Sequence, residues 1–370
     1  MTKKIYFITG GGTGGHIYPA LAVADMLFKE ENTGNIYYIG NPNNLEATII
    51  KDKDYEFLPV ISSGMPRKLS FSFIKWTCQM ILAWIKCCKY IKKYKPDVIF
   101  GTGGYVSAPV LLAGMTMKIP FVMHDCDANP GLVTRKLAPY AKSLSVAFDS
   151  AKEKLHNKNC KVNGNPIREK FSTLTKTQAR KDLKLDDKLT ICIMGGSQGA
   201  QTINNAIIPI LEKLSKNYDL QIIFQTGKKN FDRTAEKLKE IYPDYIKDKN
   251  IIIQPYFDDM VTILKACDIA VSRAGSLSIS ELCASSIAPI FIPYPYAAAD
   301  HQRKNAKYMV QNGAGLYLED SDTNAENLYK MITKLVENKT LLVEIQKQSG
   351  KLAKFDGTRN IIQQIFDCTN

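Results

Sequence analysis

Short apolar runs bounded by turn-forming residues recur along the whole chain and are mostly separated by segments of helix length. Runs of this kind, rich in Ile, Val, Phe and Tyr, predict buried β-strands. They lie at residues 5–9, 35–40, 57–61, 97–101, 120–124 and 143–148, and again at 189–195, 220–227, 250–257, 268–275, 288–295 and 314–319. The alternation of strands with helical segments predicts an α/β protein with parallel, doubly wound sheets.

The two halves of the chain open alike, at residues 3–24 and 188–207, with a basic residue, an apolar strand, a glycine-rich turn and a helical segment. Between the halves, residues 161–171 carry Asn-Gly and Asn-Pro turn signals and are typical of a linker. The pattern predicts two Rossmann-like domains, residues 1–164 and 165–370, with the last helix a candidate to return to the N-terminal domain. Ligands bind at the carboxyl ends of strands in open α/β sheets, so we expect a central cleft between the two sheets.

The turn after the first strand, residues 10–16 (GGGTGGH), matches the dinucleotide-binding spacing G-x-G-x-x-G. A dinucleotide site also needs an acidic residue where the second strand ends, and none follows that strand until Glu46. A P-loop is excluded because His16 stands where its lysine should be. The alternative is a tight turn without a ligand, but five glycines are more than such a turn requires. The sequence therefore predicts an anion-binding turn beside an imidazole.

Two further glycine-rich turns follow predicted strands, at residues 100–109 and 194–204. Each such turn donates only a few backbone N–H groups, so a set of three indicates several phosphate groups. The pattern fits a protein that binds two phosphorylated substrates.

The formal net charge of +13 is concentrated in the first part of the chain. Residues 1–165 hold 21 Lys and Arg against 12 Asp and Glu, which predicts an anionic partner for this part. Nucleic acid and anionic lipid headgroups would both complement this positive charge, so the charge alone does not distinguish between them.

The nine cysteines form no C-x-x-C pair and no zinc spacing. With a first apolar run too short for a signal peptide, they predict a cytoplasmic protein without disulfides.

A basic and apolar stretch lies between Phe57 and Pro96, where eight Lys and Arg residues occur and no acidic residue. Lysines interrupt it, so no membrane-spanning helix is predicted. Apolar residues at helical spacing form a stripe within it, comprising Trp76, Met80, Ala83, Trp84, Cys87 and Ile91. Such a stripe is typical of a core helix, but both tryptophans of the chain beside a polybasic rim indicate interfacial binding. We therefore expect residues 66–95 to bind an anionic membrane surface.

Six segments occur in the order found in the MurG family of N-acetylglucosaminyltransferases of peptidoglycan synthesis, namely GGTGGHIYPA, GTGGYVSAP, GNPIR, GGSQGAQTIN, SRAGSLSISE and DHQRKNA. The resemblance spans roughly residues 5–310. It implies a GT-B fold and an inverting hexosyltransferase that moves N-acetylglucosamine from UDP-GlcNAc to the MurNAc C4 hydroxyl of lipid I, giving lipid II. UDP-GlcNAc is then a substrate, and the resemblance implies no cofactor and no metal.

By resemblance, the second half binds the donor. Ser197 and Gln198, in the turn GGSQGA, are expected at the diphosphate together with Arg168 and Arg273. Backbone N–H groups and guanidinium groups at that place stabilise the charge of the leaving group.

The resemblance also implies how the nucleoside and the sugar are held. Phe257 is expected to bind uracil through its backbone, with Tyr256 packing nearby, and Glu281 to accept hydrogen bonds from the ribose. Gln302 is expected to bond the hexose hydroxyls and so to select one hexose over its isomers. The loop and helix start beside them comprise Ser276, Leu277, Ser278, Ile279 and Ser280.

The resemblance places the acceptor diphosphate on the two glycine turns of the first half. The residues concerned are Thr13, Gly14, Gly15, Gly103, Gly104 and Tyr105. His16 is the candidate catalytic base, because a neutral imidazole can take the proton from the attacking hydroxyl. The alternative is that His16 only binds a phosphate oxygen.

One departure from the family pattern lies at residues 124–127, where HDCD stands in place of the usual HEQN. Asp127 replaces an asparagine, and because an ionised carboxylate only accepts hydrogen bonds, a contact to a carbonyl or phosphate oxygen is weakened. Asn129 is a candidate substitute. Asp125 and Asp127 also match the D-x-D metal motif of another glycosyltransferase fold. We interpret that match as a coincidence, because glycine turns and arginines already neutralise the diphosphate.

The sequence leaves other functions open. They are another GT-B UDP-sugar enzyme, such as a glycolipid transferase or an epimerase, a dinucleotide-dependent oxidoreductase, and a nucleic-acid or membrane-binding module without chemistry. The basic stretch disfavours the epimerase, and the donor residues disfavour the module. Expected partners are UDP-GlcNAc, lipid I, an anionic membrane surface and other cell-wall synthesis proteins, but no nucleic acid. The expected location is peripheral, at the cytoplasmic face of the plasma membrane.

Overall fold

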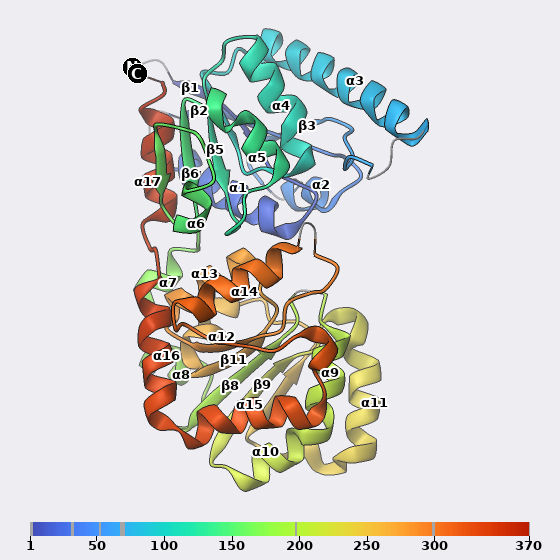
Figure 1. Ribbon diagram of the computed structural model, residues 1–370, viewed down its shortest axis with the longest axis vertical. Coiled ribbons are helices and arrows are strands. Elements are labelled where there is room, and N and C mark those ends of the chain that lie inside the picture. The colour runs from blue at the N-terminus through green and yellow to red at the C-terminus, as the bar shows by residue number, and fades with distance from the viewer. Residues whose placement is uncertain are drawn as a thin grey trace. The chain divides into compact units, whose positions relative to one another are not determined.

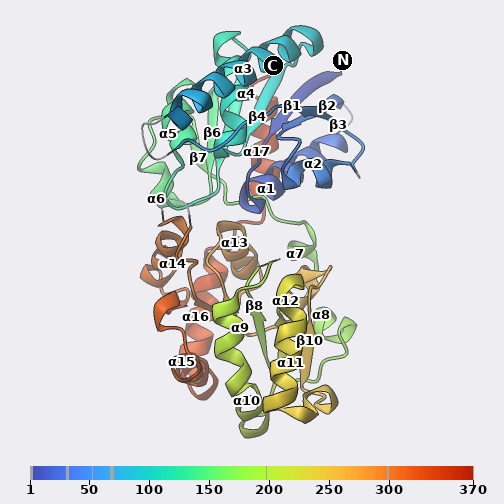
Figure 2. The ribbon, with the colours of Figure 1, turned by 90° about the vertical axis from the view of Figure 1, so that its right-hand side faces the viewer.

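The computed structural model describes residues 3–30, 33–51, 53–66, 71–196, 198–297 and 300–369. The chain divides into two compact units, residues 1–167 with 356–370, and residues 168–355 (Figure 1 and Figure 2). The division lies just past Asn165, and the last segment of the expected C-terminal domain belongs to the first unit.

The first unit is built on a seven-stranded parallel sheet with the order β3-β2-β1-β4-β5-β6-β7. Its strands are β1 (Lys4–Thr9), β2 (Thr33–Gly40), β3 (Glu56–Pro59), β4 (Val98–Gly101), β5 (Phe121–Asp125), β6 (Ser143–Val146) and β7 (Cys160–Val162). Its helices are α1 (Gly14–Phe28), α2 (Leu45–Ile50), α3 (Phe71–Tyr94), α4 (Gly104–Thr116), α5 (Leu132–Leu137), α6 (Asp149–Lys152) and α17 (Gly357–Phe366).

Helix α17 completes the core of the first unit from the far end of the chain (Figure 1). Its Ile361 and Ile365 are fully buried in one cluster with residues of α1, β1 and β2. Its Gln364 is 1% exposed, accepts a hydrogen bond from Asn163 Nδ2 at 2.6 Å and donates to Ser143 Oγ at 2.6 Å. The first unit therefore depends on residues separated by almost the whole length of the chain.

The second unit is built on a six-stranded parallel sheet with the order β10-β9-β8-β11-β12-β13. Its strands are β8 (Leu189–Met194), β9 (Leu220–Gln225), β10 (Ile251–Gln254), β11 (Ile269–Ser272), β12 (Ala288–Phe291) and β13 (Leu316–Tyr317). Its helices are α7 (Lys170–Thr173), α8 (Lys176–Asp182), α9 (Gln201–Ile207), α10 (Leu211–Asn217), α11 (Phe231–Ile241), α12 (Met260–Ala266), α13 (Ser276–Ala284), α14 (His301–Gln311), α15 (Ala325–Glu337) and α16 (Lys339–Lys351).

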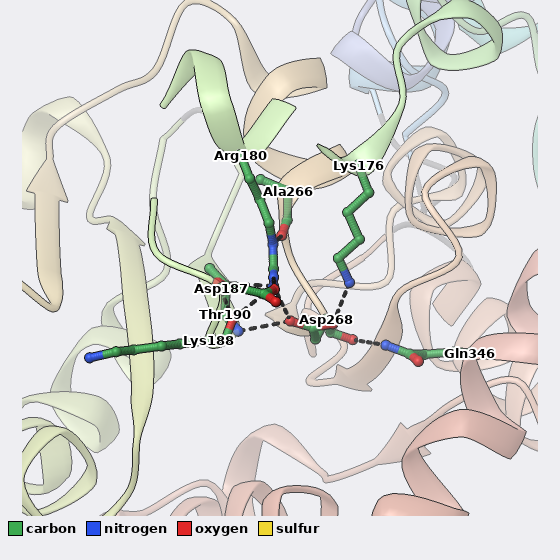
Figure 3. A network of polar contacts seen from close by, with 8 residues as sticks. All are labelled: Lys176, Arg180, Asp187, Lys188, Thr190, Ala266, Asp268 and Gln346. Carbon is green, nitrogen blue, oxygen red and sulfur yellow. Dashed lines mark hydrogen bonds and ion pairs between the residues drawn. The ribbon is translucent and has the colours of Figure 1, made fainter. Parts of the chain in front are cut away.

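A polar network anchors the amino ends of the strands in this sheet (Figure 3). The Asp268 carboxylate, just before β11, accepts hydrogen bonds from Arg180 Nη2 at 2.8 Å and from Thr190 N at 2.8 Å, and it pairs with Lys176. Gln346 Nε2 donates to the Asp268 carbonyl at 3.0 Å. The network fixes α8 and α16 at the amino ends of the strands. The glycine turn after β8 lies at the opposite, carboxyl end of the sheet.

All twelve predicted strands form, and every strand pair among the described residues is parallel, so the α/β prediction is confirmed. The expected linker, residues 161–171, differs in part. It begins inside β7 and ends in α7. Strand β7 has three residues with an exposed lysine, Lys161, at its centre, and so lacks the apolar run that marks the other strands.

Candidate functional site

The two glycine turns of the first unit meet at the point where the strand order of the sheet reverses. Strands β1 and β4 are neighbours, and the turns that follow them lead into α1 and α4. Such a switch point is where open α/β sheets bind ligands. Thr13 lies at the start of α1, and its exposed hydroxyl makes no capping hydrogen bond. Gly14 and Gly15 are the first residues of the helix.

His16 lies at the start of α1, and its imidazole contacts the second glycine turn. Its Nδ1 lies 2.9 Å from the Thr102 carbonyl oxygen, and Thr102 Oγ1 donates to the His16 carbonyl at 2.7 Å. Because a carbonyl only accepts, we assign the ring proton to Nδ1, which leaves the lone pair on Nε2. A Cβ on Gly104 would lie 2.8 Å from the Gly11 carbonyl oxygen and 3.0 Å from His16 Cδ2. Glycine at 104 therefore lets the second turn approach the imidazole.

Glu46 holds the first glycine turn, a role that the sequence did not predict. Its fully buried carboxylate accepts hydrogen bonds from Gly12 N at 3.4 Å and from Asn41 N at 3.1 Å. Asn44 Nδ2 bonds Tyr105 OH at 3.0 Å, and the Tyr105 ring covers Gly12. The first acid after β2 thus points into the turn, which argues against a ribose-binding role and against the oxidoreductase hypothesis.

The segment 124–127 combines buried and half-buried charge. The Asp125 carboxylate accepts hydrogen bonds from Asp127 N and Gly131 N, both at 3.1 Å. Burial, followed by the charge of Asp127, raises the pKa of Asp125. His124 is fully buried, its Nε2 lies 3.0 Å from Asn165 Oδ1, and burial lowers its pKa to about 4. Asp125 and His124 therefore organise the loop, and only Asp127 among the three is half-buried.

The structure offers no preformed cluster for a metal in the part of the chain that it describes. No three or more His, Cys, Asp or Glu side chains are placed there so that they could hold an ion.

Apart from Arg168, which precedes α7, the predicted donor residues lie in loops and helix starts that follow strands of the second sheet. Residues 276–281 begin α13 after β11, and Arg168 Nη2 donates to Glu281 Oε1 at 3.1 Å. Burial raises the pKa of the Glu281 carboxyl, and the positive charge of Arg168 offsets part of this rise. Gln302, in the first turn of α14, accepts from Tyr294 N at 3.0 Å. Ser197 lies outside the described residues, between the described Gly196 and Gln198.

The contacts of Arg273 are to residues that follow β12 and β13, and its place at the diphosphate stays a prediction. Its Nη1 donates to the carbonyl oxygens of Ile292 at 3.0 Å and Pro293 at 3.1 Å and pairs with Asp320, and its side chain is 12% exposed. With three acceptors at one nitrogen, Arg273 stabilises the loop after β12.

Gln225, which the sequence did not single out, joins two of the predicted donor segments. Its Oε1 accepts from Phe257 N at 2.9 Å, and its Nε2 donates to the Gly196 carbonyl at 3.3 Å. The available signal was a polar residue directly after the apolar run 222–224 of β9.

Helix α3 exposes a different face from the one expected. The expected stripe faces the core: Ala83, Cys87 and Ile91 are buried, and both tryptophans donate to nearby oxygens, on Ser63 and Thr116. The opposite face is apolar and exposed, and we call it the α3 outer stripe; it comprises Phe71, Ile74, Ile81, Leu82 and Ile85. Arg67 and Lys68 lie outside the described residues. No described helix has the length and apolar character needed to cross a membrane.

Comparison with known proteins covers both units. The N-terminal domain of glycosyltransferase family 28 matches residues 6–146, and the C-terminal domain of that family matches residues 190–365. A "UDP-N-acetylglucosamine--N-acetylmuramyl-(pentapeptide) pyrophosphoryl-undecaprenol N-acetylglucosamine transferase" of Halothermothrix orenii is 37% identical over 98% of this chain and 98% of its own. The transferase of that name from Francisella philomiragia is 37% identical over 100% of this chain and 99% of its own.

Solved structures agree with these matches. The crystal structure of Acinetobacter baumannii MurG superimposes with a TM-score of 0.77 at 27% identity, over 99% of each chain. A UDP-GlcNAc 2-epimerase from Neisseria meningitidis, at 14% identity and a TM-score of 0.67 over 98% of this chain and 100% of its own, shares the fold alone. The present chain therefore belongs to glycosyltransferase family 28, within the MurG family, and has the GT-B fold.

Proposed function

We propose that this chain transfers N-acetylglucosamine from UDP-GlcNAc to the C4 hydroxyl of N-acetylmuramic acid in undecaprenyl-diphospho-MurNAc-pentapeptide, with inversion at the anomeric carbon. Identity to transferases named for this reaction, along nearly the whole chain, supports the chemistry. The observation that carries the proposal within the structure is His16, an imidazole with its lone pair on Nε2 between two glycine turns.

His16 acts as the base in this mechanism. As the acceptor oxygen bonds to the anomeric carbon, its proton passes to His16 Nε2, and the bond from that carbon to the phosphate oxygen breaks. The hydrogen bond from Nδ1 to the Thr102 carbonyl fixes the ring and stabilises the imidazolium that forms. The acceptor diphosphate is bound by the exposed Thr13 hydroxyl and the backbone of Gly14 and Gly15, beside the second turn at residues 103–105.

The donor is held by the second unit. Arg168 places positive charge at the departing diphosphate together with the turn at residues 195–199, and Glu281 receives the ribose hydroxyls. The bond between Arg168 and Glu281 orients both side chains, so that charge neutralisation and ribose recognition are adjacent. The Phe257 backbone is assigned to uracil and Gln302 to the hexose hydroxyls.

Release of UDP in the presence of a lipid I analogue tests the proposal. UDP-GlcNAc should support turnover, and UDP-GalNAc and UDP-glucose should support much less. The variant His16→Gln should lower kcat by about a hundredfold or more with little change in the KM for the acceptor. His156→Gln, at an exposed histidine of the same unit, is the matched control. Full turnover with weaker acceptor binding in His16→Gln would reduce His16 to a phosphate ligand, and absence of UDP release by the unmodified chain would refute the transferase itself.

We infer in addition that the chain attaches peripherally to the cytoplasmic face of the plasma membrane through α3. The α3 outer stripe presents Leu82 and Phe71, which are 66% and 82% exposed, next to the exposed Lys75, Lys86 and Lys89. An apolar face with a rim of lysines is suited to an anionic lipid surface.

A further inference from the structure

The loop after β9 contacts both sides of the proposed donor site. We call residues 225–230 (QTGKKN) the β9 loop. Strand β9 lies between β8 and β10 in the sheet. The glycine turn after β8 is assigned to the diphosphate, and the loop after β10 carries Phe257, assigned to uracil. The β9 loop is therefore placed between the two segments that receive the two parts of UDP.

Gln225 reaches both segments with one buried side chain. It is 3% exposed, and its amide accepts from Phe257 N at 2.9 Å and donates to the Gly196 carbonyl at 3.3 Å. A buried amide that lost either partner would leave a polar group unsatisfied, which disfavours displacement of one segment without the other.

The backbones of the β9 loop and the diphosphate turn are in direct contact. A Cβ on Gly199 would lie 2.0 Å from the Thr226 carbonyl oxygen, and one on Gly227 would lie 2.4 Å from the Gln198 carbonyl oxygen. Asn230 Nδ2 donates to the same Gln198 carbonyl at 3.1 Å. No side chain separates the two turns at these points, so movement of one is transmitted to the other.

A second contact joins the β9 loop to the uracil side. The ammonium group of Lys228 lies 5.1 Å from the centre of the Tyr256 ring, in the range of a cation–π interaction. Tyr256 directly precedes Phe257. The uracil segment is thus connected to the β9 loop through Gln225 and through Lys228.

We propose that the β9 loop, acting through Gln225, couples recognition of uracil to recognition of the diphosphate; this inference rests on the proposed donor site. A uracil that orders the Phe257 backbone also orders the Gly196 turn, so the diphosphate binds to a turn that is already in place. Gln225 is a positioning residue in this role. Selection of uracil over other nucleobases therefore also affects binding of the diphosphate, at which the leaving group departs.

Calorimetric titration of uridine and of UDP into the full chain tests the coupling. Gln225→Met keeps the side-chain length and removes both hydrogen bonds. We expect UDP to bind about tenfold more weakly and uridine only about twofold more weakly, so that the preference for UDP over uridine falls. Gln221→Met is the matched control, because Gln221 is 4% exposed and lies on the same strand, four residues from Gln225 towards its amino end. It should leave both affinities within about twofold of the unmodified chain.

Equal losses for uridine and UDP in Gln225→Met would overturn the coupling, since Gln225 would then only shape the uracil segment. Unchanged affinities would overturn it as well. If thermal unfolding shows that Gln225→Met does not fold, the half-buried Asn230→Ala takes its place, with UDP about threefold weaker and uridine unchanged; equal changes there would again overturn the coupling. Failure of the unmodified chain to bind UDP would instead refute the proposed donor site.

Discussion

Replacement of Leu82 by serine should release the protein from membranes, because Leu82 lies at the centre of the α3 outer stripe. Burial of a whole leucine side chain contributes roughly 2 kcal/mol. Leu82 is 66% exposed, so roughly 1.3 kcal/mol of that amount is available to a lipid surface. A change of about 1.4 kcal/mol is tenfold in an equilibrium constant, and Leu82→Ser should therefore weaken partitioning about tenfold.

Lys89→Glu tests the electrostatic part of the same surface. The exposed Lys89 lies on the same side of α3 as Leu82. Each cation near an anionic leaflet contributes about 1 kcal/mol, and reversal of one charge changes the interaction by about 2 kcal/mol, which is about thirtyfold. Unlike Leu82→Ser, this variant should have no effect on neutral vesicles.

Co-sedimentation with vesicles of neutral lipid, and of neutral lipid mixed with an anionic phospholipid, measures both effects. Val343→Ser is the matched control, because Val343 is a 59% exposed apolar residue on helix α16 of the second unit. It should not change partitioning. If Leu82→Ser and Lys89→Glu both bound anionic vesicles as tightly as the unmodified chain, the α3 outer stripe would not be a lipid-binding surface.

Three further predictions concern the loop at 124–127 and the anchor of the second sheet. Asp127→Asn should lower the KM for the lipid-linked acceptor about threefold in steady-state assays, because it removes a negative charge near phosphate; an unchanged KM would place Asp127 away from the phosphates. Burial holds the pKa of His124 at about 4, whereas an unfolded histidine titrates at about 6.5, so the unfolded state binds the proton first as pH falls. Urea unfolding should show about 3 kcal/mol of stability lost between pH 6.5 and 4, and a smaller loss in His124→Gln. Asp268→Asn should lower the unfolding free energy by about 2 kcal/mol without a change in UDP affinity, because Lys176 loses its carboxylate and Arg180 keeps only the exposed Asp187.

The strands of both sheets were predictable because strands of a parallel sheet are buried on both faces and read as continuous apolar runs. The same reasoning fails for β7. Only three residues pair there, and the exposed Lys161 interrupts the run. The shorter edge strand β13 was predictable because it lies inside an apolar run, whereas a pattern of hydrophobicity carries no signal for a short edge strand that a lysine interrupts.

The face that α3 turns to the core was not predictable from periodicity. The stripe that contains Trp84 and the stripe that contains Leu82 are both apolar and lie on opposite sides of the helix. Which of them is buried depends on the packing of α3 against α4. The tryptophans favoured the wrong stripe, because an amphipathic side chain suits a core position as well as an interface when its N–H finds an acceptor.

The glycine turns and His16 were recognisable as local patterns, but the residues that hold them were not. Glu46 and Gln225 both act on backbone groups of other loops. Strand order brings those loops together, and the sequence pattern predicts strands without their order. Arg273 is the opposite case, because its residue type suggested an anion-binding site, whereas its hydrogen bonds in the structure go to carbonyl oxygens of the loop after β12.

The return of α17 to the first unit has a consequence for synthesis on the ribosome. The first unit includes residues 356–370, so its core stays incomplete while residues 168–355 are being translated. At typical rates of about 5–20 residues per second, that interval lasts roughly 10 to 40 s. During it, the apolar surface of α1 that α17 later covers is open to solvent and to chaperones. The order of folding is therefore reversed relative to the order of synthesis: the unit that begins first can finish only after the second unit has emerged.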